Sequence, residues 1–133
     1  MVLATKPERY SILIADDDQD CREGLREIVE PEGFRTVLAE NGEQALDIVQ
    51  QQEVHLLVCD MYMPRLSGLE TLQLARQVKQ ALPCILVSGD VDDRLMQQAL
   101  AAKVYSVLAK PVSKNVLIYI VVRALMKAYE DVA

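Results

Sequence analysis

The sequence predicts an α/β domain in which five parallel strands are covered by helices on both faces. Three observations lead to this prediction. The chain has 133 residues, a length that suits one domain. It contains five short runs rich in Val, Ile and Leu, which are typical of parallel strands buried on both faces. The segments between these runs carry apolar residues at helical spacing, so strands and helices alternate along the chain.

The strand candidates are short and almost continuously apolar. We expect five strands, at residues 11–15, 36–39, 54–59, 84–88 and 105–109. Residues 1–8 precede the first strand and are expected to form a short flexible tail, because Pro7 discourages regular structure. The predicted domain then covers residues 9–130.

Capping residues delimit the helix candidates. Asn41 and Ser67 are expected to cap the second and third helices, and Gly33 is expected to end the first. The apolar stripes that identify the five helices are Leu25, Ile28 and Val29; Ala45, Leu46 and Val49; Leu69, Leu72, Ala75 and Val78; Leu95 and Ala99; and residues 116–125.

This alternation of strands and helices has a preferred topology. Right-handed crossovers place helices on both faces of a parallel sheet. The expected strand order is 2-1-3-4-5, a flavodoxin-like, doubly wound arrangement whose switch point lies between the first and third strands. Ligands of such sheets bind at that point, outside the carboxyl ends of the strands.

Composition and charge exclude several classes of protein. The net charge of −6 argues against a broad surface for nucleic acid or an anionic membrane. The longest apolar run, residues 116–122, is much shorter than the roughly 20 residues of a membrane span. Three cysteines without paired spacing suit a reducing compartment, and the N-terminus lacks an apolar signal core. We therefore expect a cytoplasmic protein.

Polar side chains follow four of the five predicted strands. Asp16 and Asp17 come directly after the first, Asp60 after the third, Ser88 ends the fourth, and Lys110 follows the fifth. Carboxylates about 4 Å apart repel by roughly 4 kcal/mol at an effective dielectric near 20, so they share a proton or recruit a cation. A carboxylate nucleophile, Mg²⁺, a lysine and a hydroxyl at one edge form an apparatus for phosphoryl transfer to aspartate.

Each of these residues also has an ordinary interpretation. Asp17 and Asp18 suit the start of a helix, where acidic groups offset the helix dipole. Asp60 suits the start of a turn before Pro64, Ser88 a strand end and Lys110 a solvated surface. The joint placement at successive strand ends is what favours a functional site.

Four segments resemble the receiver domain of two-component response regulators. They are ILIADD, DMYMPRLSG, ILVSG and LAKP, and they occur in the order and at the intervals of that family. The resemblance runs over residues 10–128, nearly the whole chain. It implies a signalling switch, rather than an enzyme that acts on a separate substrate.

The resemblance implies a role for each residue of the acidic site. Asp60 would be the phosphoacceptor, attacking the phosphorus of a phosphohistidine donor. Asp17 would hold Mg²⁺ directly, and Asp16 directly or through water. Tyr62 would lend its backbone carbonyl to the metal, while Asp18 falls outside the acidic pair and suits a helix N-terminus.

Further roles follow for residues around this centre. Ser88 would bond a phosphoryl oxygen and shift on activation, and Gly89 would leave room for a partner. Lys110 would pair with Asp60 and then with the phosphoryl group. The Lys110–Pro111 bond would be cis, which only an X–Pro bond reaches at low cost.

One position departs from the family pattern. The family commonly has an aromatic switch residue three positions before the lysine, where this chain has Val107. Tyr105 lies two residues earlier and, by strand alternation, on the same face. Whether Tyr105 replaces the switch or packs against the sheet stays open at this point.

The expected partners are proteins. The resemblance implies a sensor histidine kinase or a phosphotransfer protein as phosphodonor. The net charge leads us to expect no direct contact to nucleic acid or membrane. The last helix is apolar nearly all round, so we expect a homodimer or partner surface on the fifth strand and fifth helix.

Two alternatives remain on the residues alone. One is a degenerate receiver that binds proteins without phosphorylation. The other is a phosphatase of the haloacid-dehalogenase type, in which Asp16 would be the nucleophile and Asp18 its partner. That phosphatase needs acidic metal ligands after the lysine, where this chain has only Glu130 and Asp131.

Overall fold

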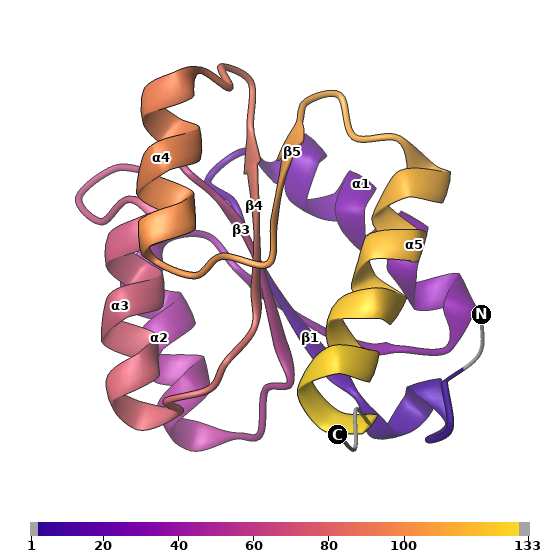
Figure 1. Ribbon diagram of the computed structural model, residues 1–133. Helices are drawn as coiled ribbons and strands as arrows, with labels where there is room; N and C mark the ends of the chain where they lie inside the picture. Colours follow the sequence, from indigo (N-terminus) through magenta and orange to yellow (C-terminus); the bar gives the residue numbers. More distant parts are fainter. Residues whose placement is uncertain (1–2, 131–133) are drawn as a thin grey trace.

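Five parallel strands form a single sheet in the order β2-β1-β3-β4-β5, which confirms the predicted topology (Figure 1). The computed structural model describes residues 3–130. The strands are β1 (Ser11–Ala15), β2 (Arg35–Ala39), β3 (Leu56–Asp60), β4 (Cys84–Ser88) and β5 (Ser106–Ala109).

The pairing of neighbouring strands, rather than composition, sets the strand ends. β1 and β4 have the predicted bounds, and β2 begins one residue earlier than expected. β3 begins at Leu56, which pairs with Ile12, so apolar Val54 precedes the strand. It continues to Asp60, which pairs with Val87 of β4. The acidic residue is thus part of the sheet.

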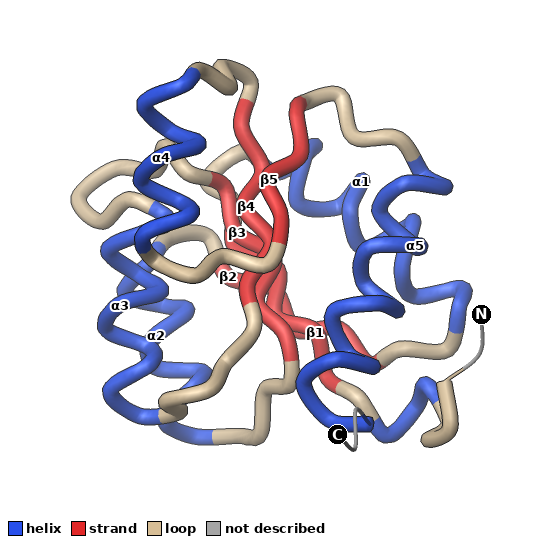
Figure 2. Tube along the Cα trace, viewed as in Figure 1, coloured by secondary structure: helices blue, strands red, loops and turns tan. Residues whose placement is uncertain are grey.

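Helices cover both faces of the sheet (Figures 1 and 2). Two of them, α1 (Gln19–Val29) and α5 (Lys114–Leu125), lie on one face. The other three, α2 (Gly42–Gln51), α3 (Gly68–Val78) and α4 (Asp93–Ala101), lie on the opposite face. No helix within residues 3–130 is long and apolar enough to cross a membrane.

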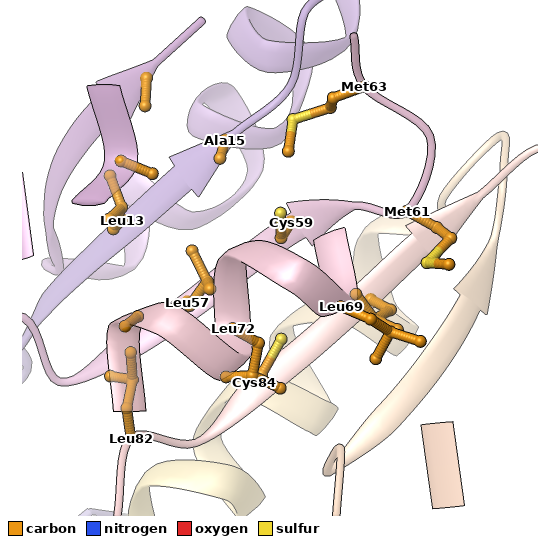
Figure 3. Packing of buried hydrophobic residues seen from close by; sticks show 14 of the residues in the cluster. Leu13, Ala15, Leu57, Cys59, Met61, Met63, Leu69, Leu72, Leu82 and Cys84 are labelled. Carbon is orange, nitrogen blue, oxygen red and sulfur yellow. The ribbon is translucent and has the colours of Figure 1, made fainter. Parts of the chain in front are cut away.

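The two faces bury separate apolar clusters, because alternate strand residues point to opposite sides. Leu13, Leu57 and Leu86 belong to the cluster under α2, α3 and α4. Figure 3 shows Leu69 and Leu72 of α3 in this cluster. Cys59 and Cys84 pack here as small apolar side chains, and burial raises the pKa of the Cys84 thiol to about 12. The cluster under α1 and α5 includes Ile12, Ile14, Val58 and Ile85.

The predicted caps are present. The Asn41 side chain accepts the Gln44 N–H at 2.8 Å. Ser67 and Glu70 form a reciprocal capping box at the start of α3. The end of α1 differs slightly from the prediction. The helix stops at Val29, a single 3₁₀ turn follows, and Gly33 ends that turn with a φ of 103°.

The amino-terminal segment contacts the end of the chain. The N–H groups of Ala4 and Thr5 donate to the Glu130 carboxylate, at 2.7 and 3.1 Å, and the Tyr10 hydroxyl donates to it too. Pro7 begins a 3₁₀ turn, so the expectation that it would prevent regular structure is wrong. Proline suits this position because its missing N–H is not needed there. Residues 1–2 of the expected tail lie outside the described residues.

His55 packs at the same edge of the sheet. Its Nδ1 accepts the Ser11 N–H at 2.9 Å, and its ring lies edge-on to Tyr10 and Tyr129. The Tyr129 hydroxyl donates to the His55 carbonyl at 2.6 Å. His55 is therefore a structural residue at the edge opposite the carboxyl ends of the strands.

The outer side of α5 carries two exposed apolar side chains. Leu117 and Val121 are fully buried against the sheet, whereas Val116 and Tyr119 are about half exposed, at 46% and 52%. Arg123 lies over the Tyr119 ring. The exposed face of α5 is therefore mixed, because Lys114, Asn115 and Arg123 are exposed beside these two side chains, and it is less apolar than the sequence predicts.

Candidate functional site

Chain-distant residues meet at the carboxyl edge of the sheet. Asp16 follows β1, Asp60 ends β3 and Lys110 follows β5. The Lys110 Nζ lies 3.1 Å from Asp16 Oδ2 and 3.3 Å from Asp60 Oδ2. Carboxylate oxygens of Asp16, Asp17 and Asp60 all lie within 4.8 Å of one another. The sheet topology therefore brings together three carboxylates and one ammonium group.

Asp16 is fully buried and bonded on every side. Its N–H donates to the Ala39 carbonyl at 3.1 Å, and its Oδ1 accepts the Asp18 N–H at 2.9 Å. Asp18 itself caps α1, accepting the N–H groups of Asp20 and Cys21. Its expected role at a helix N-terminus is confirmed. Asp17 and Asp18 are both exposed, and of these two only Asp17 belongs to the carboxylate group with Asp16 and Asp60.

Asp60 is nearly buried, and its surroundings act on its charge in opposite directions. Burial and the neighbouring Asp16 raise the pKa of the Asp60 carboxyl, whereas Lys110 and the Tyr62 N–H oppose that rise. The Tyr62 N–H donates to Asp60 Oδ1 at 3.3 Å. The Tyr62 side chain points outward and is 56% exposed.

Lys110 is held in its charged form. Burial alone would lower its pKa, but the hydrogen bond and charge of Asp16, together with Asp60, outweigh burial and raise it. Lys110 joins Pro111 through the cis bond that the resemblance implies. The ammonium group therefore sits as a fixed cation between two buried carboxylates.

Ser88 lies between the acidic residue of β3 and the lysine. Its carbonyl accepts the Lys110 N–H at 2.9 Å, and its buried Oγ bonds the Asp90 backbone at 3.1 Å. Gly89 lies beside it in an exposed loop. A Cβ added at Gly89 would meet no atom within 4 Å, so the space over this loop is open.

The donor set of this edge fits Mg²⁺. Three carboxylates within reach of one another supply only hard oxygen ligands, and Mg²⁺ prefers one or two such groups together with water and phosphate oxygens. No thiol or imidazole belongs to this group of described residues. Softer metals such as zinc or copper match it less well.

The strand-alternation prediction for Tyr105 and Val107 is wrong. Val107 packs against the cluster under α2, α3 and α4, whereas Tyr105 packs against the cluster under α1 and α5. The reason is that β5 begins at Ser106, so Tyr105 precedes the strand and its alternation. Just upstream, Lys103 has a φ of 55°, which turns the chain before the strand. Tyr105 therefore does not share a face with Val107.

Gly68 supports the acceptor loop in a way that its motif alone did not reveal. Its N–H donates to the Met61 carbonyl at 2.8 Å. A Cβ at Gly68 would lie 2.5 Å from the Asp60 carbonyl oxygen and 3.0 Å from Met61 Cα. Only glycine allows the start of α3 to approach the end of β3 this closely.

We expect Gly68→Ala to destabilise the fold by roughly 2–3 kcal/mol, because the new methyl group would overpack against backbone atoms. Gly24→Ala is the matched control, since a Cβ there meets nothing within 4 Å. That change in the middle of α1 should stabilise the protein by roughly 0.5–1 kcal/mol. Urea unfolding followed by circular dichroism measures both. Equal stability of Gly68→Ala and the wild-type protein would show that the close approach carries no strain.

The phosphatase alternative does not fit this geometry. Asp18 caps α1, and Glu130 lies at the opposite edge of the sheet, bonded to Ala4, Thr5 and Tyr10. Asp131 lies outside the described residues. The acidic ligand that such an enzyme needs after its lysine is therefore missing from the site among residues 3–130.

Comparison with known proteins identifies the family of this chain. The family model described as the response regulator receiver domain matches residues 12–122. Response regulator RR06 of Streptococcus pneumoniae is 34% identical over 119 residues, covering 90% of this chain and 54% of the relative. The transcriptional regulatory protein CpxR of Escherichia coli is 38% identical over 109 residues, covering 80% and 45%. The chain thus spans about half the length of these curated relatives.

Solved structures share the fold. A receiver domain protein of Methanospirillum hungatei superimposes with a TM-score of 0.85 at 24% identity, over 91% of this chain and 97% of that one. A receiver protein of Pseudomonas putida gives a TM-score of 0.81 at 29% identity, over 91% and 99%. The first likeness supports the fold alone.

Proposed function

Because this chain belongs to the family of response regulator receiver domains, the phosphorylation-dependent switches of two-component systems, we propose that it accepts a phosphoryl group on Asp60. The observation that carries this proposal is the juxtaposition at the sheet edge. The Asp60 carboxylate lies 3.3 Å from the Lys110 ammonium and within metal-sharing distance of Asp16 and Asp17. A degenerate receiver would have no reason to keep all four groups together.

The proposed step is a transfer from phosphohistidine to carboxylate. An Asp60 oxygen attacks the phosphorus, forming a P–O bond while the P–N bond to the donor imidazole breaks. The electron pair of that bond stays on the imidazole nitrogen. The product on this chain is an acyl phosphate, and its charge must be stabilised by neighbouring groups.

Mg²⁺ is the proposed cofactor. Asp17 and Asp60 would hold it directly, Asp16 directly or through water, and the Tyr62 carbonyl would complete the protein ligands. When bound, the ion supplies charge neutralisation at the phosphoryl oxygens. Lys110 already carries a fixed positive charge at the same place, so it is assigned to a further phosphoryl oxygen.

Ser88 is the proposed link between the site and the rest of the chain. Its Oγ bonds the Asp90 backbone in this structure, and it would bond a phosphoryl oxygen once Asp60 is modified. That exchange would move the loop that begins at Gly89. The added charge thereby biases a two-state element.

The proposed partner surface includes β5 and α5. Val107 lies on β5 and Pro111 in the loop after it, while Val116 and Tyr119 are the exposed apolar side chains of α5. We assign this surface to a homodimer or a protein partner. Tyr105 lies on the other side of the sheet from Val107, which argues against it as a replacement switch residue.

The remaining assignments follow from this function. Residues 9–130 form the receiver domain, and its phosphodonor is a sensor histidine kinase or a phosphotransfer protein. The chain promotes only its own phosphorylation and dephosphorylation, so it is not an enzyme acting on another substrate. Three free cysteines suit the cytoplasm. The net charge of −6 disfavours direct binding to nucleic acid.

Acetyl phosphate labelling with Mg²⁺ tests the proposal. The acyl phosphate is trapped by borohydride reduction, and mass spectrometry of the peptides locates the modified residue. We expect the label on Asp60. Modification of Asp16 instead would favour a phosphatase, and the absence of any label would favour a degenerate receiver.

A further inference from the structure

Arg22 is a buried arginine that reaches the acidic turn from α1. Its side chain is only 9% exposed. Nη1 donates to the Asp16 backbone carbonyl at 2.7 Å, and this bond is itself buried. Nη2 lies 3.9 Å from a carboxylate oxygen of Glu40, an exposed residue after β2. One guanidinium group thus joins the end of β1 to the turn that follows β2.

Helix geometry explains how Arg22 reaches this position. Its N–H donates to the Asp18 carbonyl at 2.9 Å, within the first turn of α1. Helical side chains lean toward the N-terminus of their helix, so a long side chain at this position points back over the Asp16–Asp18 turn.

The contact controls the direction in which Asp17 leaves the sheet. The peptide group between Asp16 and Asp17 is planar, so a bond to the Asp16 carbonyl also orients the Asp17 nitrogen. The Asp16 side chain is held separately by the Asp18 N–H and by Lys110. Arg22 therefore restrains the Asp16 carbonyl, a part of this turn that those two side-chain bonds do not hold.

We propose that Arg22 is a positioning residue for the metal site, holding the Asp16–Asp17 peptide so that both carboxylates face Asp60. This inference rests on the proposed binding of Mg²⁺ at that edge. It assigns Arg22 no contact with the metal or the phosphoryl group.

The direction in which Arg22→Gln changes the affinity for Mg²⁺ separates a positioning role from a purely electrostatic one. Removing a positive charge near three carboxylates strengthens the binding of a cation by Coulomb's law. Losing the positioning bond weakens it, because ligands held by outer contacts typically lose 10–100-fold in metal affinity when those contacts are removed. Arg22→Gln is therefore expected to raise the Mg²⁺ dissociation constant by about tenfold.

The experiment compares three full-length variants by isothermal titration calorimetry with MgCl₂. Arg26→Gln is the matched control, because Arg26 lies one turn further along α1 and forms a partly exposed ion pair with Glu23, away from the acidic turn. It removes the same charge and is expected to bind Mg²⁺ as tightly as the wild-type protein or slightly more tightly. Arg22→Lys keeps one donor and the charge, so its affinity should fall between wild type and Arg22→Gln.

A second readout needs neither metal nor phosphodonor. In metal-free protein, the Asp18 amide should exchange its hydrogen about tenfold faster in Arg22→Gln than in Arg26→Gln, because loss of the Arg22 bond frees the Asp16 backbone that carries the acceptor oxygen, Asp16 Oδ1. If Arg22→Gln does not fold, Arg22→Lys tests the proposal instead. Its Mg²⁺ dissociation constant and the exchange rate of its Asp18 amide are both expected to rise about threefold. The proposal would be overturned if the substituted protein bound Mg²⁺ with wild-type affinity and exchanged its Asp18 amide at the wild-type rate. Labelling of Asp60 is measured separately, so failure of the proposed function remains distinguishable.

Discussion

Asp60→Asn is expected to abolish phosphate incorporation from acetyl phosphate. The substitution keeps the shape of the side chain but replaces the nucleophilic carboxylate oxygen with an amide. The amide also removes one of the three carboxylates that lie within 4.8 Å of one another. Mg²⁺ binding should therefore weaken at the same time. Radiolabel counting and intact-protein mass spectrometry measure the incorporation.

Asp20→Asn provides the control for this change. Asp20 lies in the first turn of α1, close in the chain to the acidic turn, and it is exposed. It loses the same charge without altering the cluster, so its labelling should match that of the wild-type protein. Persistent labelling of Asp60→Asn at the wild-type level would show that another residue accepts the phosphoryl group.

Lys110→Met is expected to change metal binding and phosphorylation in opposite directions. The Lys110 ammonium lies 3.1 Å from Asp16 and 3.3 Å from Asp60, so it competes with a metal for the same two carboxylates. Its removal should tighten Mg²⁺ binding by at least about tenfold. Phosphorylation should nevertheless become about 100-fold slower, because a preorganised cation at the phosphoryl oxygens is lost.

Calorimetry with MgCl₂ and the initial rate of labelling at saturating Mg²⁺ measure these two effects. Lys114→Met is the control, since it removes the same charge from an exposed residue at the start of α5. It should leave both quantities near their wild-type values. An unchanged labelling rate in Lys110→Met would remove the lysine from the proposed transfer step.

The order of elements could be predicted from local signals. The apolar runs that became β1 and β4 are continuous and have clear ends, so their bounds were exact. Asn41 and Ser67 cap their helices because their side chains bond backbone groups only three residues away. Such interactions depend on sequence neighbours, so they can be read without the fold.

Other features depended on contacts between distant segments. Strand alternation predicts the wrong face for Tyr105, because the true start of β5 is Ser106, which pairing with β4 determines. Gly68 belongs to the segment DMYMPRLSG, but the segment alone does not explain why glycine is needed there. The explanation is that the start of α3 lies so close to the end of β3 that a Cβ would clash. The role of Arg22 requires the Asp16 carbonyl to turn toward α1, and no residue type signals that orientation.

By itself, the sequence determined which chemical groups follow which strands. Hydrophobic patterning and chain order place polar or charged residues at the carboxyl ends of four strands, or directly after them. These residues are Asp16, Asp17, Asp60, Ser88 and Lys110. Only the tertiary structure decided how those groups face one another. Patterning acts over a few residues, whereas the direction of a buried carboxylate results from partners that the folded sheet brings from far along the chain. At this edge, that partner is the Lys110 ammonium, which lies 94 residues after Asp16 in the chain and contacts both Asp16 and Asp60.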